Sequence, residues 1–173
     1  MMAPTVLLRS QADFAALSAL ETSTLLTCAR ALWQSQHSPV EGPGAPRHLL
    51  RGKNIGLLCS PTHAHDGLLF TRAATALGAR VAPLRACLSL PGTRAQVQRM
   101  ARVLGRLYDA VECLGLAPEL VRRIGIEAGV PVFEGLASGQ HPTHWLAHAL
   151  DLEPGTDALR CLAIQAVLVS VLG

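Results

Sequence analysis

Two short segments of the sequence hold polar side chains that can bind a small ligand or take part in proton transfer. Both segments contain imidazoles, and both also contain a hydroxyl group within three residues of an imidazole. Imidazoles exchange protons near neutral pH, and hydroxyls and imidazoles both form hydrogen bonds with polar ligands. Seven residues therefore form the candidate ligand-binding set, and His141 is the candidate catalytic residue within it. The set is Ser60, Thr62, His63, His65, His141, Pro142 and His144.

The same imidazoles raise the question of a metal ion. If the two segments meet in space, His63, His65 and His144 have the ligand type that zinc prefers, and Asp66 and His148 are able to extend the cluster. The alternative is that the first two histidines are exposed loop residues and that His144 only fills space. The spacing does not decide between these interpretations, so the metal site is a hypothesis and we assign no cofactor.

The order of apolar and amphipathic stretches predicts how these residues are positioned. Four apolar runs alternate with helical patterns, which is typical of βαβ units and a parallel sheet. We therefore predict an α/β fold, a three-layer sandwich in which helices flank a four-stranded parallel sheet. Strands are expected at 54–59, 80–84, 109–114 and 131–134, and helices at 18–35, 67–78, 93–108, 118–129 and from 142 onward.

Helix-boundary signals support these positions. Ser18 and Glu21 form a capping-box pattern, Thr93 is a candidate N-cap, and Pro118 suits a first helical turn. Ligands of parallel sheets bind beyond the carboxyl ends of the strands. The loops at these ends are 60–66, 85–92, 114–117 and 135–144, and the first and last of them contain the whole candidate ligand-binding set.

Composition limits the classes of protein to consider. The chain has 173 residues, is 50% hydrophobic but 3% aromatic, and carries a net charge of +3, which suits one domain with an aliphatic core. No basic run interleaves with aromatics, so we expect no nucleic-acid partner. The first residues lack a signal-peptide pattern, and Arg160 and Gln165 interrupt the apolar C-terminal segment, so we expect no membrane span. Five dispersed cysteines without a CxxC pair favour buried thiols in the cytoplasm.

Three further residues have a structural interpretation. Cys59 ends the first predicted strand, so we expect it in the core and not as a nucleophile. Trp33 and Trp145 both fall on predicted helices, where we expect them to pack against neighbouring side chains.

Several segments together resemble the ornithine/aspartate carbamoyltransferase family. Residues 101–110, Ala-Arg-Val-Leu-Gly-Arg-Leu-Tyr-Asp-Ala, are similar to the family's Ala-Arg-Val-Leu-Ser-Arg-Tyr-x-Asp-Ala. Residues 141–147 resemble a His-Pro-x-Gln-x-Leu-Ala segment, and residues 157–173 resemble the last helix of the family. Shorter similarities lie at 50–53 and 131–136, so the resemblance covers nearly the whole chain.

The resemblance implies the N-terminal, carbamoyl-phosphate-binding domain of the family, followed directly by its C-terminal helix. In family members an acceptor domain, which binds ornithine in the ornithine enzymes, lies between the segments that correspond to 141–147 and 157–173. Only residues 151–156 fill that gap here, so we expect the acceptor domain to be deleted. We predict one domain over residues 1–173, with its body at 1–150 and the last helix packed back on it.

The resemblance also shows where functional residues have changed. The family holds phosphate with a Ser-x-Arg-Thr-Arg segment, but residues 60–66 contain no arginine and end in Asp66, which places a negative charge where an anion docks. Leu114 stands where the family has an arginine, and His144 stands where it has glutamine, while the preceding His-Pro pair matches. We therefore expect that the chain alone does not transfer carbamoyl groups.

Three functions are consistent with these replacements. The first is a small-ligand-binding or assembly module, with a small anionic or carbamoyl-like ligand. The second is a repurposed transferase or hydrolase that uses the histidine-lined former carbamoyl phosphate pocket. The third is a regulatory partner of a full-length carbamoyltransferase. Because family members form trimers through this domain, we expect self-association, with a trimer ahead of a dimer.

Overall fold

A four-stranded parallel sheet forms the centre of the molecule. The structure is a computed structural model that describes residues 18–37, 46–84, 93–152 and 155–173. Each pair of neighbouring strands is parallel, so the predicted parallel sheet is confirmed. In their order across the sheet, the strands are β2 (Arg80–Pro83), β1 (Asn54–Cys59), β3 (Ala110–Leu114) and β4 (Val132–Glu134).

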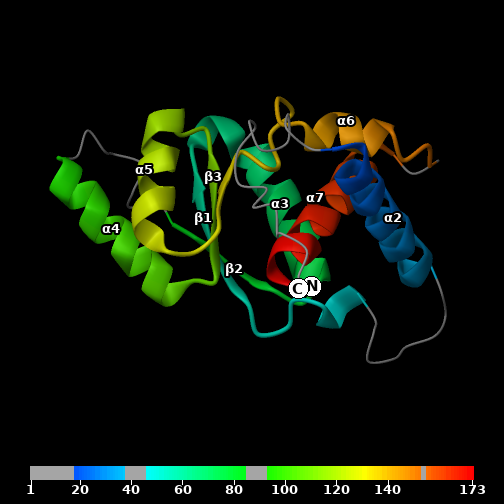
Figure 1. Cartoon of the computed structure of the whole chain (residues 1–173), viewed down its shortest axis with the longest axis horizontal. Coiled ribbons are helices and arrows are strands. Elements are labelled where there is room, and N and C mark those ends of the chain that lie inside the picture. The colour runs from blue at the N-terminus through cyan, green and yellow to red at the C-terminus, as the bar shows by residue number, and fades with distance from the viewer. Residues whose placement is uncertain (1–17, 38–45, 85–92, 153–154) are drawn as a thin grey trace.

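Helices cover both faces of this sheet (Figure 1). One face is covered by α4 (Arg94–Leu107) and α5 (Pro118–Ala128). The other face is covered by α3 (Ala64–Ala76) and α7 (Thr156–Leu172), and α2 (Ala19–Gln36) packs on α7. The predicted α/β class with a sheet between helical layers is confirmed. The short elements are η1 (Pro46–His48), η2 (Pro61–His63) and α6 (Thr143–His148).

The larger hydrophobic core lies on the side of α2, α3, α6 and α7. The predicted capping box starts α2, because the Glu21 amide donates to Ser18 Oγ at 3.3 Å and the Ser18 amide donates to Glu21 Oε2 at 2.8 Å. Leu25, Ala29 and Leu32 recur at intervals of three and four residues and are buried. This spacing places the three side chains on one apolar stripe of α2. Burial of that stripe in the core stabilises the packing of the helix.

The last helix, α7, is buried on nearly all sides. Residues 161–168 are all buried, which confirms the burial expected from its nearly continuous apolar sequence. Gln165 is the polar exception, and it is only 3% exposed. Its Oε1 accepts a hydrogen bond from Gln36 Nε2 at 3.0 Å, and its Nε2 donates to the Ala73 carbonyl at 3.2 Å. Both polar atoms of the Gln165 side chain are therefore hydrogen-bonded, and these bonds join α7 to α2 and α3.

A second, smaller core lies between the sheet and the helices α4 and α5. Val97, Ala101 and Leu104 of α4 are buried against it, as are Val121 and Ile124 of α5. Both faces of the central strands are thus covered, which explains why burial along β1 and β3 is continuous and does not alternate.

Two expectations differ from the structure. α3 begins at Ala64, earlier than the predicted residue 67, because η2 leads directly into it. Trp145 is 47% exposed, so its predicted packing role is wrong. The short helix α6 buries Thr143, Leu146 and Ala147 instead, which turns the indole outward. The loop expected at 85–92 lies outside the described residues.

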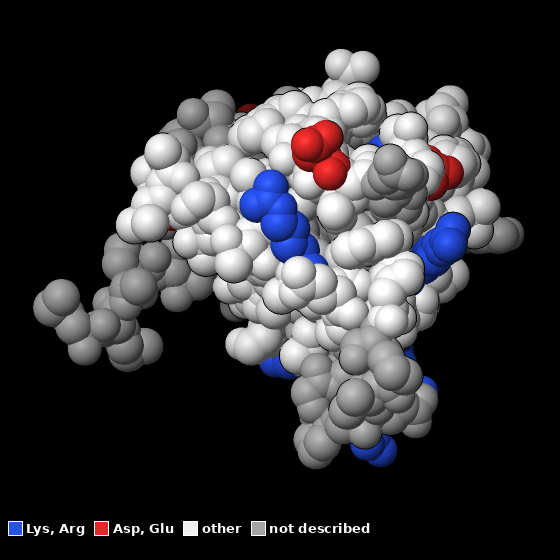
Figure 2. Space-filling view, turned by 90° about the vertical axis from the view of Figure 1, so that its right-hand side faces the viewer, with Lys and Arg blue, Asp and Glu red and all other residues white. Residues whose placement is uncertain are grey.

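Charge is distributed unevenly over the surface. Figure 2 shows the side on which α2 lies, where charged side chains are sparse and separated by uncharged surface. α2 itself contributes only Glu21 and Arg30 as charged residues. By contrast, α4 contains four arginines and no acidic residue. Within the described ranges, no helix is long and apolar enough to cross a membrane.

Candidate functional site

The strand order places a topological switch point between β1 and β3. The chain leaves β1 towards β2 on one side, whereas β3 leads to β4 on the other side. Loops diverge above such a point and leave a crevice at the carboxyl ends of the strands. Here the two loops also touch, because the Ser60 amide donates to the Leu114 carbonyl at 2.9 Å. The loops at 60–63 and at 114–117 thus border the switch point.

Three polar side chains of the candidate set meet at this switch point. Ser60 Oγ and Thr62 Oγ1 lie 2.8 Å apart, and each of them lies 3.1 Å from His63 Nδ1. Gly115 closes the cluster from the β3 side with a positive φ of 72°. A Cβ on Gly115 would collide with Ser60 Oγ and His63 Nδ1. Glycine is required here both by the backbone conformation and by this close approach.

The next two residues of the first loop have partners on α7. His65 Nε2 lies 3.6 Å from Asp157 Oδ2, and both side chains are at least half exposed. Asp66, in the first turn of α3, accepts a hydrogen bond from Arg160 Nη2 at 2.9 Å, and the two side chains are 19% and 13% exposed. The same Nη2 donates to the Ala137 carbonyl at 2.6 Å. The negative charge expected at Asp66 is therefore neutralised by a guanidinium from the last helix.

The second loop buries its histidine instead of presenting it. His141 is 2% exposed, and its Nδ1 accepts a hydrogen bond from the Thr143 amide at 3.2 Å. Burial lowers the pKa of His141 to about 4, so its imidazole is neutral at neutral pH. His144 is half-buried, and its ring centroid lies 4.8 Å from that of the exposed His148.

Glu112 is a polar residue of this region that the sequence reasoning missed. It lies on β3, is fully buried, and its Oε1 accepts a long hydrogen bond from the Ala137 amide at 3.4 Å. Its Oε2 has no hydrogen-bond partner in the described part of the chain. Burial raises the pKa of Glu112 well above its usual range, and the nearby charge of Asp66 raises it further. A lone acidic residue inside an apolar strand was the available signal.

Cys59 lies beneath the start of α3 and is half-buried. Its Sγ contacts the carbonyl oxygens of Ser60 at 3.4 Å and of His63 at 3.3 Å. Burial raises the pKa of the Cys59 thiol, and the charges of Asp66 and Glu112 raise it further. Since the thiolate is the reactive form, this environment argues for a packing role and against a nucleophile.

The structure does not assemble the metal site that the sequence left open. His63 forms hydrogen bonds with Ser60 and Thr62, His65 faces Asp157, and the rings of His144 and His148 meet edge to face. No group of three or more His, Cys, Asp and Glu side chains that could hold a metal ion occurs among the residues described. The zinc hypothesis for His63, His65 and His144 therefore receives no support from their positions.

A twisted parallel sheet with hydroxyl and imidazole groups at its switch point defines an α/β domain with a small polar site at the strand ends. No protein-family model matches the chain. The catabolic ornithine carbamoyltransferase of Burkholderia mallei is 38% identical over 140 residues, which cover 81% of this chain and 40% of that protein. The ornithine carbamoyltransferase of Streptococcus pyogenes is 36% identical over 121 residues, covering 70% of this chain and 36% of that protein.

Solved structures agree with these sequence matches. The ornithine carbamoyltransferase of Pyrococcus furiosus superposes with a TM-score of 0.66 and 24% identity, over 86% of this chain and 46% of that chain. The chain belongs to the ornithine/aspartate carbamoyltransferase family. It spans about 40% of the length of the curated relatives it matches.

Proposed function

We propose that this chain binds a small, uncharged carbamoyl-like ligand at the switch point and does not transfer carbamoyl groups by itself. The observation that supports this most is the pair of Asp66 and Arg160. The guanidinium that reaches the carboxyl edge is already bonded to a carboxylate and to the Ala137 carbonyl. The groups left for a ligand are the hydroxyls of Ser60 and Thr62 and an imidazole, which suit an amide-like group better than a dianion.

The magnitudes favour loss of carbamoyl phosphate binding. The arginine-bearing segment and the further arginine expected from the family resemblance are replaced in this chain, as is the glutamine of the second loop. Each charge-assisted hydrogen bond contributes about 1.5–3 kcal/mol. Losing three such groups weakens binding by at least about 4 kcal/mol, which is roughly a thousandfold in the dissociation constant.

The connection between α6 and α7 supports the loss of transfer. α6 ends at His148 and α7 begins at Thr156, so within this chain no acceptor domain is inserted between them. Holding two substrates in reactive geometry contributes roughly 7–11 kcal/mol in favourable cases. Without a second substrate site, this contribution is lost unless another chain supplies it.

A side-by-side titration tests the proposed ligand class. Methylurea serves as the uncharged carbamoyl probe and inorganic phosphate as the anionic probe, with chemical shifts followed by NMR. We expect methylurea to shift the signals of Ser60, His63 and Gly115, and we expect this response to disappear in Ser60→Ala. His48→Ala, in the exposed η1 ahead of β1, is the matched control and should respond like the wild type. Phosphate alone acting on these three signals, or neither probe acting on them, contradicts the proposal.

A hydrolytic activity is the second candidate, and one contact favours it. Ser60 Oγ lies 3.1 Å from His63 Nδ1, so the imidazole is placed to take the hydroxyl proton as serine attacks an activated ester. Hydrolysis of p-nitrophenyl acetate by the wild type, abolished in both Ser60→Ala and His63→Ala, supports this candidate. Equal rates in the wild type and both variants eliminate it.

Assembly is proposed from the family resemblance. We expect the chain to self-associate, with a trimer ahead of a dimer, and light scattering on the purified protein measures this directly. A monomer at micromolar concentration contradicts self-association. A regulatory role with a full-length carbamoyltransferase predicts a mixed complex in the same measurement when the two proteins are combined.

A further inference from the structure

The positive charge of the molecule is concentrated on α4 and α5. These two helices carry six arginines and two glutamates, a net charge of +4, while the whole chain carries +3. The rest of the chain is therefore slightly acidic, with a net charge of −1. Grouping like charges in one layer creates a positive potential that attracts anions to this side of the molecule.

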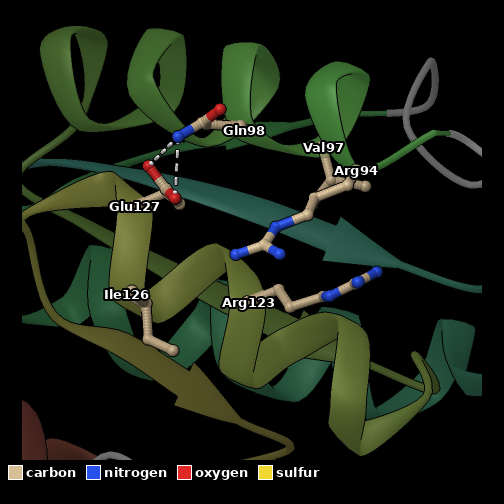
Figure 3. Close-up of a pocket in the computed structure, with 6 residues that line it drawn as sticks. All are labelled: Arg94, Val97, Gln98, Arg123, Ile126 and Glu127. Carbon is tan, nitrogen blue, oxygen red and sulfur yellow. Dashed lines mark hydrogen bonds between the residues drawn. The ribbon is translucent and has the colours of Figure 1, made fainter.

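An open hollow of about 70 Å³ lies between the same two helices. Figure 3 shows the guanidinium groups of Arg94, from α4, and Arg123, from α5, in the space between the helices. Two like charges are thus brought into one concave site from opposite walls. The lining consists of Arg94, Val97, Gln98, Arg123, Ile126 and Glu127.

The single acidic residue of the hollow is held by other groups. Gln98 Nε2 donates to both carboxylate oxygens of Glu127, at 2.9 and 3.0 Å. Arg102 Nη2 lies 3.5 Å from Glu127 Oε2 and neutralises it from outside the hollow. Glu127 therefore does not balance the charge of Arg94 or Arg123.

The two arginines keep most of their hydrogen-bonding capacity. Arg123 Nε lies 3.9 Å from Glu119, which forms its closer ion pair, at 2.7 Å, with Arg122. The Arg94 guanidinium has no ion pair or hydrogen bond with any residue in the described ranges. Each guanidinium presents several N–H donors in a fixed plane, an arrangement that matches phosphate oxygens in a bidentate manner.

We infer that this hollow is a binding site for a phosphate group, carried by a small phosphate monoester and held by Arg94 and Arg123. Val97 and Ile126 provide an apolar wall for the organic part of the ester. The site shares no residue with the switch-point cluster, so this inference does not rest on the proposed function.

Titration with inorganic phosphate and with phenyl phosphate, at constant ionic strength, tests the site. Backbone amide signals of 94–98 and 123–127 and the arginine Nε–H signals are followed by NMR. We expect each of Arg94→Gln and Arg123→Gln to weaken binding about tenfold, since each removes one charge-assisted contact. Arg99→Gln removes the same charge from an exposed position of α4 and should change binding by less than about twofold. Thermal melts verify that all three variants fold.

Several results would overturn the assignment. These are the absence of any shift at the two segments, an equal loss of affinity in all three variants, or equally strong binding of acetate. Shifts confined to the signals of Ser60 and His63 would indicate that phosphate binds at the switch point and not in the hollow. That last result would also contradict the proposed function, whereas the first three leave it untouched.

Discussion

The ionisable side chains around the carboxyl edge of the sheet offer little free charge to a ligand. Arg160 neutralises Asp66 at 2.9 Å, burial keeps His141 uncharged near neutral pH, and burial raises the pKa of Glu112 well above its usual range. Ser60 and His63 complete a site whose groups interact with each other. A site of this kind has little net charge with which to attract a phosphate dianion, in contrast to the hollow between α4 and α5.

His141 gives a prediction about acid stability. Burial lowers its pKa from 6.5 to about 4, so between these values the unfolded chain binds the proton more readily than the folded chain. The contribution of neutral His141 to the free energy of unfolding is fully present above pH 6.5. As the pH falls to 4, the free energy of unfolding decreases by about 3 kcal/mol because this contribution is lost. We expect His141→Gln to flatten the decline in the free energy of unfolding between pH 7 and pH 4, measured by urea titration. His48→Gln is the control, and an unchanged slope in His141→Gln would refute the assignment.

The pH dependence of stability predicted for Glu112 has the opposite sign to that predicted for His141. Its raised pKa means that the folded chain holds this proton more tightly than the unfolded chain. Its stabilising contribution is present below the usual carboxyl pKa and is lost as the pH rises towards the raised value. Glu112→Gln resembles the protonated side chain, so it should become more stable than the wild type as the pH rises from 5 to 8. Thermal melts of the wild type and of Glu112→Gln across this pH range measure the difference, and Glu119→Gln, at an exposed position, is the control. Parallel pH curves for the wild type and Glu112→Gln would contradict the prediction.

Gly115 connects the two loops at the switch point. Gly115→Ala introduces a Cβ at a positive φ and drives it against Ser60 and His63. We expect a loss of at least about 1–2 kcal/mol in the free energy of unfolding from the backbone conformation alone, together with altered His63 ring signals. Gly139→Ala is the control because nothing lies within 4 Å of its Cβ. If the His63 ring signals of Gly115→Ala match those of the wild type, the predicted contact between residue 115 and His63 is wrong.

At the scale of elements, α4 and α5 depend on one close approach. A Cβ on Gly105 of α4 would collide with the Ala128 carbonyl at the end of α5. The two helices cover the smaller core and form both walls of the arginine hollow. Their separation is therefore set by a glycine inside a helix, where glycine is otherwise unfavourable by about 1 kcal/mol relative to alanine.

Two alanine substitutions separate helix propensity from packing. Gly105→Ala should reduce the free energy of unfolding by more than about 2 kcal/mol, because the gain in helix propensity is smaller than the cost of overpacking. Gly125→Ala, on α5, has its nearest contact at 3.8 Å and should be neutral or slightly stabilising. Urea unfolding of both variants measures the difference. Equal effects would mean that helix propensity and not packing governs Gly105.

Local sequence patterns predicted the starts of α2 and α5 and the position of β1, because residues close in sequence determine each of these features. The capping box at Ser18, the first turn at Pro118 and the apolar run of β1 all appear as expected. Trp145 was predicted wrongly because its exposure depends on how the short α6 packs, and six residues give little periodicity. The start of α3 was placed late because the 3-10 turn before it has no distinct sequence signal.

At the scale of the whole molecule, the fold could be predicted but the electrostatics of the site could not. The sequence indicated the parallel sheet, the segments at its carboxyl edge and the family. Arg160 is 94 residues from Asp66, and no local pattern relates them. The arginine hollow likewise requires the relative positions of two helices. Contacts between distant residues decide which charges remain available, and these contacts exist only in the folded chain.

Formation of citrulline or carbamoyl-aspartate tests most directly whether the purified chain transfers carbamoyl groups. Carbamoyl phosphate is supplied with ornithine or with aspartate, and product is compared with a reaction that lacks the protein. We expect no product above that background, because Arg160 is already paired and the chain contains no inserted acceptor domain. A saturable, protein-dependent product signal that is lost in His141→Gln would contradict the proposal that the chain does not transfer carbamoyl groups by itself.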